Sequence, residues 1–274
     1  LENACIRVIT KAIKLTNERN ICLSGGVALN CKANGIIKKI PEVNNLFVQP
    51  AASDRGLSLG CAAYTHVKYS KTKLSPLKNL YLGPRYSKKI IEENLKLCGL
   101  KYKKIINPEK LAAKKISEGK VIGWFQGRSE IGPRALGNRS ILGDASNKRM
   151  KDIINKKVKF REEFRPFAPS CIEQKAKKYF EISDSSPFMT AACFVKEKYQ
   201  KLLPSITHLD KTARLQTVNK IQNNKYYKLL LEIEKITGFP IVLNTSFNIK
   251  GQPIVETPLD AISTYYSTGM DCLF

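Results

Sequence analysis

Two strand-to-helix units within the first 70 residues constrain the fold more than any other feature of this sequence. Each unit has a short apolar run, then a turn rich in small residues, and then a segment with helical spacing. The strands are expected at Asn20–Leu23 and Asn45–Val48, and the helices at Val27–Lys38 and Leu57–Tyr69. Because a helix that connects two strands usually makes them parallel neighbours, the chain is predicted to be of the α/β class.

The rest of the chain continues this mixed pattern. Helices are expected at Ala4–Leu15, Ser87–Leu97, Pro108–Glu118, Met150–Lys156, Tyr226–Thr237 and Pro258–Ser267, and strands at Lys120–Phe125, Phe188–Val195 and Pro240–Leu243. A connection that contains lysine, serine and proline at residues 70–84 suggests a boundary between two domains, 1–75 and 76–274. Because the chain starts and stops inside apolar patterns, we expect it to be a segment of a longer polypeptide.

Arginine is concentrated in one region, whereas lysine is spread along the chain. The 36 Lys are scattered, but six of the 11 Arg fall within 38 residues: Arg128, Arg134, Arg139, Arg149, Arg161 and Arg165. Glycine and proline turns surround them, and a guanidinium group matches two oxygens of a carboxylate or phosphate. The region predicts an oxyanion pocket. An exposed basic face or simple salt bridging is the alternative.

Lys159 and Arg161 alternate with apolar neighbours, and on an extended segment this spacing would place both side chains on one face. With Arg165 they would suit a phosphate and a leaving group, or they would form only a charged edge strand. Arg214 lies far from this cluster, in a loop that also contains His208. Arg214 is a candidate second binding group (clamp) for the same anion, or it forms a structural ion pair.

Polar residues also follow the expected strands. Gly25 and Gly26, ahead of Asn30, could let backbone N–H groups approach a phosphate or nucleoside, or could only shape a turn. Asp54 could bind a divalent metal or a ribose hydroxyl, or could cap the next helix.

A third polar run follows the apolar strand expected at Pro240–Leu243. Asn244, Ser246 and Asn248 could read the donors and acceptors of a carbamoyl or carboxamide group. They could equally cap a turn.

The net charge of +24 attracts nucleic acid or anionic substrates without specifying either. We do not expect a nucleic acid partner, because no zinc-knuckle spacing and no aromatic ladder on a basic strand is present. The eight cysteines form no CxxC pair, and the sequence shows no signal peptide or long apolar span. We therefore expect a cytoplasmic protein without a membrane partner. The two histidines lie far apart, which argues against a two-histidine metal site within the chain.

Seven stretches follow one another over nearly all 274 residues: SGGVALNCKANG, VQPAASDRGLSLG, YLGP, GWFQGRSEIGPRALGNRSIL, VKFREEFRPFAPS, HLDKTARLQTV and LNTSFNIKGQPIVETPLDAI. In these stretches the chain resembles the carboxyl-terminal portion of the O-carbamoyltransferase family of the NodU and CmcH type. The resemblance implies the end of an actin-like (ASKHA) domain, similar to the threonylcarbamoyl transferases. A YrdC-like twisted α/β domain would follow.

The family resemblance implies an ATP-dependent enzyme. Carbamoyl phosphate and ATP, with Mg²⁺, would form carbamoyl-adenylate, and the first domain would pass the carbamoyl group to a hydroxyl-bearing small-molecule acceptor with a divalent metal, iron in the complete domain. Carbamoyl phosphate would be held by Arg134, Lys159, Arg165, Arg214, Asn244 and Ser246, of which Lys159, Arg165 and Arg214 would be catalytic. The nucleotide would be bound by Gly25, Gly26, Asn30, Arg139, Arg161 and Asn248, and the metal by Asp54.

The sequence departs from the family pattern because it contains no HxxH motif. We therefore expect this chain to support adenylate formation rather than complete transfer to an acceptor. The alternatives are a threonylcarbamoyl-adenylate type of tRNA-modification enzyme, whose basic charge would bind tRNA, and a non-enzymatic nucleic-acid-binding module. The acceptor and the oligomeric state stay open, with a homodimer as one option.

Overall fold

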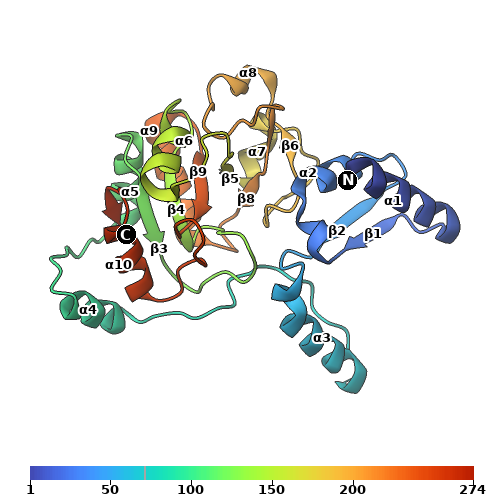
Figure 1. Ribbon diagram of the computed structural model, residues 1–274, viewed down its shortest axis with the longest axis horizontal. Coiled ribbons are helices and arrows are strands. Elements are labelled where there is room, and N and C mark those ends of the chain that lie inside the picture. The colour runs from blue at the N-terminus through green and yellow to red at the C-terminus, as the bar shows by residue number, and fades with distance from the viewer. Residues whose placement is uncertain (71) are drawn as a thin grey trace.

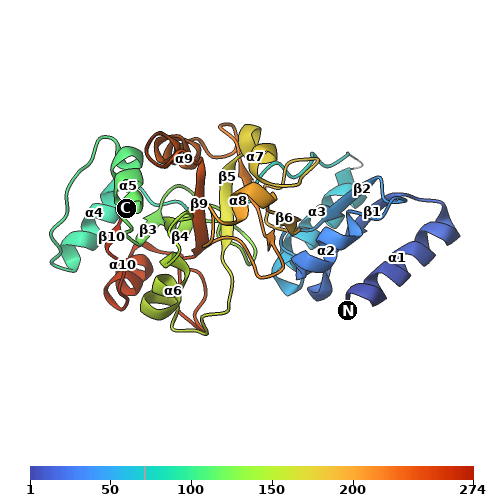
Figure 2. The ribbon, with the colours of Figure 1, turned by 90° about the horizontal axis from the view of Figure 1, so that it is seen from above.

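The computed structural model describes residues 1–70 and 72–274 and shows a mixed α/β chain (Figure 1). The predicted α/β class is therefore confirmed. The elements of the first 70 residues lie at one end of the molecule, and a six-stranded sheet with its helices lies at the other (Figures 1 and 2). Among the described residues, no helix combines the length and the apolar composition needed to span a membrane.

The N-terminal part is a small layer with two parallel strands. Its helices and strands are α1 (Glu2–Thr16), β1 (Asn20–Leu23), α2 (Cys31–Ile37), β2 (Asn45–Val48) and α3 (Leu57–Ser70). The two strands pair in parallel from Asn20 opposite Asn45 to Leu23 opposite Val48, as the sequence predicted. Packing of α1 and α2 buries Ile9, Ile13 and Ile37. Helix α3 buries none of its residues and projects from the rest of the molecule (Figure 1).

The larger part is built on a sheet with the strand order β10-β3-β4-β9-β5-β8. The two outermost pairs, β10–β3 and β5–β8, are parallel, and the three inner pairs are antiparallel. The strands are β3 (Ile122–Phe125), β4 (Arg139–Asp144), β5 (Ala168–Ile172), β8 (Gln216–Val218), β9 (Ile241–Ser246) and β10 (Cys272–Leu273), and β6 (Cys193–Phe194) and β7 (Thr212–Ala213) form a separate pair. Strand β9 lies inside the sheet and ends in polar residues.

Helices cover both faces of this sheet. The helices of the larger part are α4 (Lys88–Leu97), α5 (Pro108–Ser117), α6 (Met150–Ile154), α7 (Glu173–Tyr179), α8 (Glu197–Gln200), α9 (Asn224–Thr237) and α10 (Pro258–Tyr266). Consecutive residues of a strand point to opposite faces. Leu142 accordingly packs in the apolar cluster of α5 and α9, whereas Ile141 packs in the cluster of α6 and α7. The two cores hold the central strands rigidly from both sides.

Helix α2 packs directly against the segment 190–192 of the larger part. The backbone N–H of Ala192 donates to the carbonyl of Cys31 at 2.8 Å, and the side chain of Asn34 donates to the carbonyl of Thr190 at 2.8 Å. Gly35 allows this approach, because a Cβ there would lie 2.3 Å from the Ala192 carbonyl oxygen. The division into domains 1–75 and 76–274 stays a prediction.

Three expectations about local structure were wrong. The helix expected at Val27–Lys38 is split into a 3₁₀ turn, Gly26–Leu29, and α2, because extended Asn30 caps α2 by accepting from two backbone N–H groups. Of the strand expected at Phe188–Val195 only Cys193–Phe194 forms, since Met189 has a left-handed backbone (φ 57°).

The segment with Lys159 and Arg161 is not extended. Residues 155–159 form a π-helical turn, and Phe160 follows in the left-handed region (φ 46°). The alternation of charged and apolar residues is also typical of a strand. A turn that ends at a left-handed residue has no sequence period of its own, so the pattern could not indicate it. Strands β4 and β5 were not predicted from the sequence.

Gly137 is expected to be far more sensitive to substitution than Gly238. Both have positive φ, 102° and 78°, but a Cβ at Gly137 would lie 2.2 Å from the fully buried ring of Tyr226, whereas a Cβ at Gly238 meets no atom within 4 Å. Gly238→Ala should cost about 1 kcal/mol in free energy of unfolding, and Gly137→Ala about 3 kcal/mol, because overpacking adds to the backbone strain. Urea denaturation of the two variants measures this, and equal losses would contradict the packing argument.

Candidate anion-binding site

A cavity of about 260 Å³ opens at the carboxyl end of β9. It is lined by Pro133, Arg134, Ala135, Arg161, Arg165, Pro166, Phe167, Ala168, Met189, Arg214, Asn244, Thr245 and Ser246. Four of these residues carry guanidinium groups, and none of the described residues in the lining is an aspartate or a glutamate. The composition suits an anionic ligand.

The four arginines come from three separate stretches of chain. Arg134 lies in the loop between β3 and β4, Arg161 and Arg165 follow the π turn, and Arg214 lies between β7 and β8. The sequence cluster therefore supplies three of the four arginines in the lining, and the distant Arg214 supplies the fourth. Arg165 also pairs with Glu162 at 2.9 Å at the exposed rim.

The loop that carries Arg134 is folded around the Glu130 carboxylate. Its Oε1 accepts from the backbone N–H groups of Leu136 at 2.8 Å and of Asn138 at 2.7 Å. Burial raises the pKa of Glu130, while these hydrogen bonds oppose that effect. On its other side the loop contacts the N-terminal part, where Arg134 Nη2 donates to the Leu29 carbonyl at 3.4 Å. Arg134 is thus held between the two parts of the chain.

The arginines also affect one another. Burial, followed by the charges of Arg214 and Arg55, lowers the pKa of Arg134 to about 10. Burial, followed by Arg165 and Arg214, lowers the pKa of Arg161 to about 10. With a pKa of about 10, Arg134 and Arg161 remain protonated at neutral pH, so the cavity confines like charges. The Nε of Arg214 is buried and has no hydrogen-bond partner among the described residues. An anion would satisfy both the charge and this donor.

Lys159 is buried beside the cavity rather than in its lining. Its Nζ donates to the backbone oxygens and the side-chain oxygens of Ser246 and Asn248, over 2.5–3.1 Å. Burial, followed by the charge of Arg161, lowers the pKa of Lys159 to about 7. The lysine therefore connects the π turn to the end of β9 and fixes the position of Ser246 at the cavity.

Other arginines of the sequence cluster do not line the cavity. Arg139, on β4, is 0% exposed, and its nitrogens donate to backbone carbonyls, including those of Gln126 at 2.8 Å and Asn138 at 2.9 Å. Its guanidinium also lies 3.7 Å over the Phe125 ring. These contacts hold the β3–β4 connection together. Arg128 and Arg149 are exposed, so the predicted pocket contains only half of the cluster.

The residues predicted in the N-terminal part lie on the turns after β1 and β2. Gly25 (φ 87°) and Gly26 shape the first turn, Asn30 caps α2, and Asp54 begins a 3₁₀ turn. Residues 1–70 and 72–274 contain no group of three or more His, Cys, Asp or Glu side chains that could hold a metal ion. Asp54 therefore does not by itself fit a metal centre.

The sequence analysis missed Gln216 and Ser170, which are buried next to Asn244. A signal for Gln216 was present, since it follows Arg214 at the two-residue spacing of one strand face and alternates with the apolar residues Ala213 and Leu215. Ser170 had no such signal.

Comparison with known proteins identifies two family models. The model described as "Carbamoyltransferase C-terminus" matches residues 113–274, and "Carbamoyltransferase N-terminus" matches residues 1–63. An uncharacterized protein of Synechocystis sp. is 40% identical over 98% of this chain and 50% of its own length. Nodulation protein NolNO of Sinorhizobium fredii is 41% identical over 100% of this chain and 41% of its own length. The chain thus spans about half the length of these curated relatives.

Among solved structures, HypF of T. kodakarensis has a TM-score of 0.45 and 19% identity, covering 62% of this chain and 21% of that chain. This similarity is too low to support an argument about function.

The free energy of unfolding should depend on pH through Lys159. Its pKa is about 7 in the folded chain, against the usual 10.5, so between these values the unfolded chain binds a proton that the folded chain lacks. Stability from this group therefore rises with pH across that window, by roughly 1.4 kcal/mol per unit. The free energy of unfolding is measured by denaturation for the wild type and for Lys159→Met. From pH 6 to pH 9, the difference between the two should shift in favour of the wild type by roughly 2–3 kcal/mol. A difference that is flat or falls over this range would contradict the assignment.

Proposed function

Because this chain belongs to the carbamoyltransferase family, we propose that its arginine-lined cavity binds carbamoyl phosphate next to ATP and forms carbamoyl-adenylate. The observation that carries the proposal is the combination of four guanidinium groups with the neutral side chains of Asn244 and Ser246. The arginines suit phosphate oxygens, and the amide and hydroxyl suit a carbamoyl group.

The residues divide between the two substrates. Carbamoyl phosphate would contact Arg134, Lys159, Arg165, Arg214, Asn244 and Ser246, with Lys159, Arg165 and Arg214 as the catalytic groups. The nucleotide would contact Arg161 and Asn248, and the turn with Gly25, Gly26 and Asn30, while Arg139 supports the loop of Arg134 from beneath. The Leu29 contact of Arg134 supports this division, because it brings that turn to the cavity.

The proposed reaction needs positive charge at two points. Carbamoyl phosphate and water yield carbamate and inorganic phosphate. A carbamate oxygen then attacks the α-phosphorus of ATP, a new O–P bond forms, and the bond to pyrophosphate breaks. Negative charge grows on the α-phosphate and on the leaving pyrophosphate, and fixed guanidinium groups stabilise it without reorganising. Mg²⁺, if bound with the triphosphate, would add further positive charge there.

Transfer of the carbamoyl group to an acceptor hydroxyl is proposed for the whole protein, of which this chain spans a part. The turns after β1 and β2 lie next to the Arg134 loop, since a Cβ at Gly132 would lie 3.3 Å from the Pro50 carbonyl oxygen. An adenylate formed in the cavity would therefore have a short path to the N-terminal part.

Carbamoyl-phosphate-dependent exchange of pyrophosphate into ATP tests the adenylate-forming reaction. Lys159→Ala and Arg165→Ala should each lower the exchange rate at least about 100-fold, because Arg165 supplies a positive charge at the cavity and Lys159 holds Ser246 in position beside it. Exchange is measured with labelled pyrophosphate, with and without carbamoyl phosphate. Unchanged rates in both variants would refute their roles.

Arg149→Gln provides the matched control. Arg149 belongs to the same sequence cluster but is exposed and outside the cavity lining. Its replacement removes the same charge and should change the rate by less than about twofold. An equal loss in this variant would show that overall charge, rather than the cavity, governs the reaction.

A further inference from the structure

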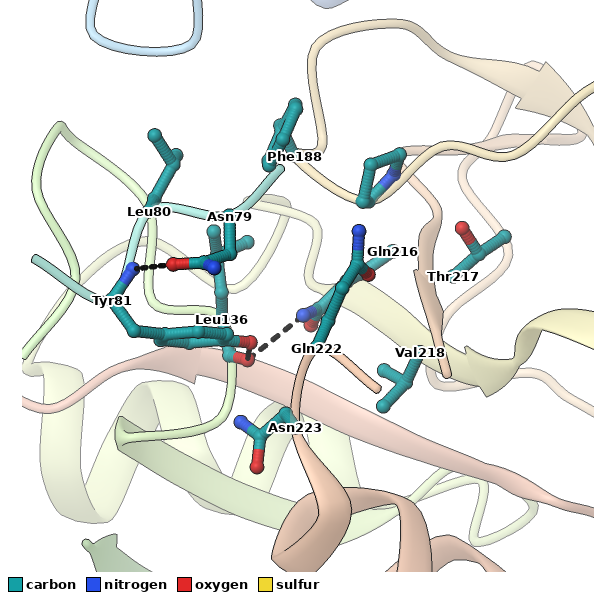
Figure 3. Close-up of a pocket in the computed structure, with 11 residues that line it drawn as sticks. Asn79, Leu80, Tyr81, Leu136, Phe188, Gln216, Thr217, Val218, Gln222 and Asn223 are labelled. Atoms are coloured by element: carbon teal, nitrogen blue, oxygen red, sulfur yellow. Dashed lines mark hydrogen bonds between the residues drawn. The ribbon is translucent and has the colours of Figure 1, made fainter. Parts of the chain in front are cut away.

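Gln216 lies behind the arginine cavity and connects it to a second, smaller cavity. It is only 2% exposed, on the edge strand β8. The smaller cavity, of about 10 Å³, is lined by Asn79, Tyr81, Leu136, Gln216, Gln222 and others (Figure 3). In Figure 3 the amide of Gln216 points toward Leu136, whose carbonyl oxygen accepts from Gln216 Nε2 at 2.8 Å.

This hydrogen bond determines which way the Gln216 amide faces. A backbone carbonyl can only accept, so Leu136 must face Nε2, and Oε1 must face the other way. Oε1 accordingly accepts from Ser170 Oγ at 2.6 Å and from Asn244 Nδ2 at 3.1 Å. The backbone carbonyl of Ala135 also accepts from Asn244 Nδ2, at 3.1 Å. Gln216 Oε1 and the Ala135 carbonyl thus each accept from Asn244 Nδ2, so Gln216 supplies one of the two contacts that orient the Asn244 amide.

The consequence is an unused acceptor on Asn244. The two hydrogens of its nitrogen have acceptors on Ala135, Ser170 and Gln216 within reach, whereas its Oδ1 is buried and has no partner among the described residues. Asn244 itself lines the arginine cavity. A buried acceptor without a donor is unfavourable. Four guanidinium groups attract an anion, and an acceptor without a donor on Asn244 beside them favours an anion that also carries an N–H.

We propose that Gln216 is a positioning residue that, through Asn244, makes the cavity selective for a phosphoryl compound with a neighbouring N–H donor. The inference rests on the proposed function, because the carbamoyl group of carbamoyl phosphate is such a donor. Acetyl phosphate has nearly the same shape but carries a methyl group in place of the amide nitrogen. It would leave Asn244 Oδ1 unpaired, and the site would discriminate against it.

Two hydrolysis-resistant ligands isolate this contact. Phosphonoacetamide and acetonylphosphonate share a phosphonate and a carbonyl group. Phosphonoacetamide carries an amide nitrogen on that carbonyl, whereas acetonylphosphonate carries a methyl group. Calorimetry on the whole chain should show the amide binding about tenfold more tightly, the usual effect of one buried hydrogen bond. In Gln216→Met this ratio should fall below about twofold, while the affinity for inorganic phosphate, which the arginines bind, stays unchanged. Asn244→Leu should show the same loss.

Gln222→Met is the control, because Gln222 lines the same small cavity but donates to the Lys78 carbonyl at 2.9 Å and makes no contact with Asn244. It should retain the wild-type ratio. A ratio near one in the wild type would overturn the selectivity. A ratio lost in Asn244→Leu but kept in Gln216→Met, or lost equally in Gln222→Met, would overturn the positioning role. If Gln216→Met no longer binds inorganic phosphate, Gln216→Ala makes the same comparison with a smaller side chain.

The outcomes also separate this inference from the proposed function. A tenfold preference for the amide without carbamoyl-phosphate-dependent exchange would support the positioning role and overturn adenylate formation. Exchange without any preference would support adenylate formation and overturn the positioning role.

Discussion

Positive charge crowded into one cavity is the constraint on which the rest of the structure depends. Burial lowers the pKa of both Arg134 and Arg161, and the charge of Arg214 lowers each of them further. Such a cluster persists only where rigid elements hold it against its own repulsion, or where an anion neutralises it. The framework around the cavity provides the rigid elements, and the phosphorylated substrates proposed for the cavity would provide the neutralising anion.

The framework consists of polar contacts supported by the sheet. Glu130 folds the loop of Arg134 around one carboxylate oxygen, and buried Lys159 holds the end of β9. The guanidinium group of Arg139 donates hydrogen bonds to backbone carbonyls on either side of the same loop. Each contact joins segments that are distant in sequence, so the cavity walls depend on long-range packing. A ligand then meets donors that are already oriented, which lowers the cost of organising them during binding and reaction.

Particular residues show how far the sequence could lead. The concentration of arginine among glycines and prolines predicted a pocket, and Arg134, Arg161 and Arg165 line one cavity together with Arg214. Arg139, five residues after Arg134, is buried in a strand instead. Composition could not separate the two, because one residue of a turn can face a cavity while a neighbour faces the core. The π turn before Phe160 was missed for a related reason, since the alternation of Lys159 and Arg161 also fits a strand.

The sequence by itself determined the α/β class, the parallel pairing of β1 with β2, and the family, because these follow from local periodicity and from motifs that occur in order along the chain. Only the tertiary structure decided which arginines share a cavity, where Lys159 directs its ammonium group, and how Gln216 orients Asn244. The physical reason is that these relations depend on the position of side chains across neighbouring strands and loops. Local sequence patterns set the direction of a side chain within its own element, but not the partner that it meets.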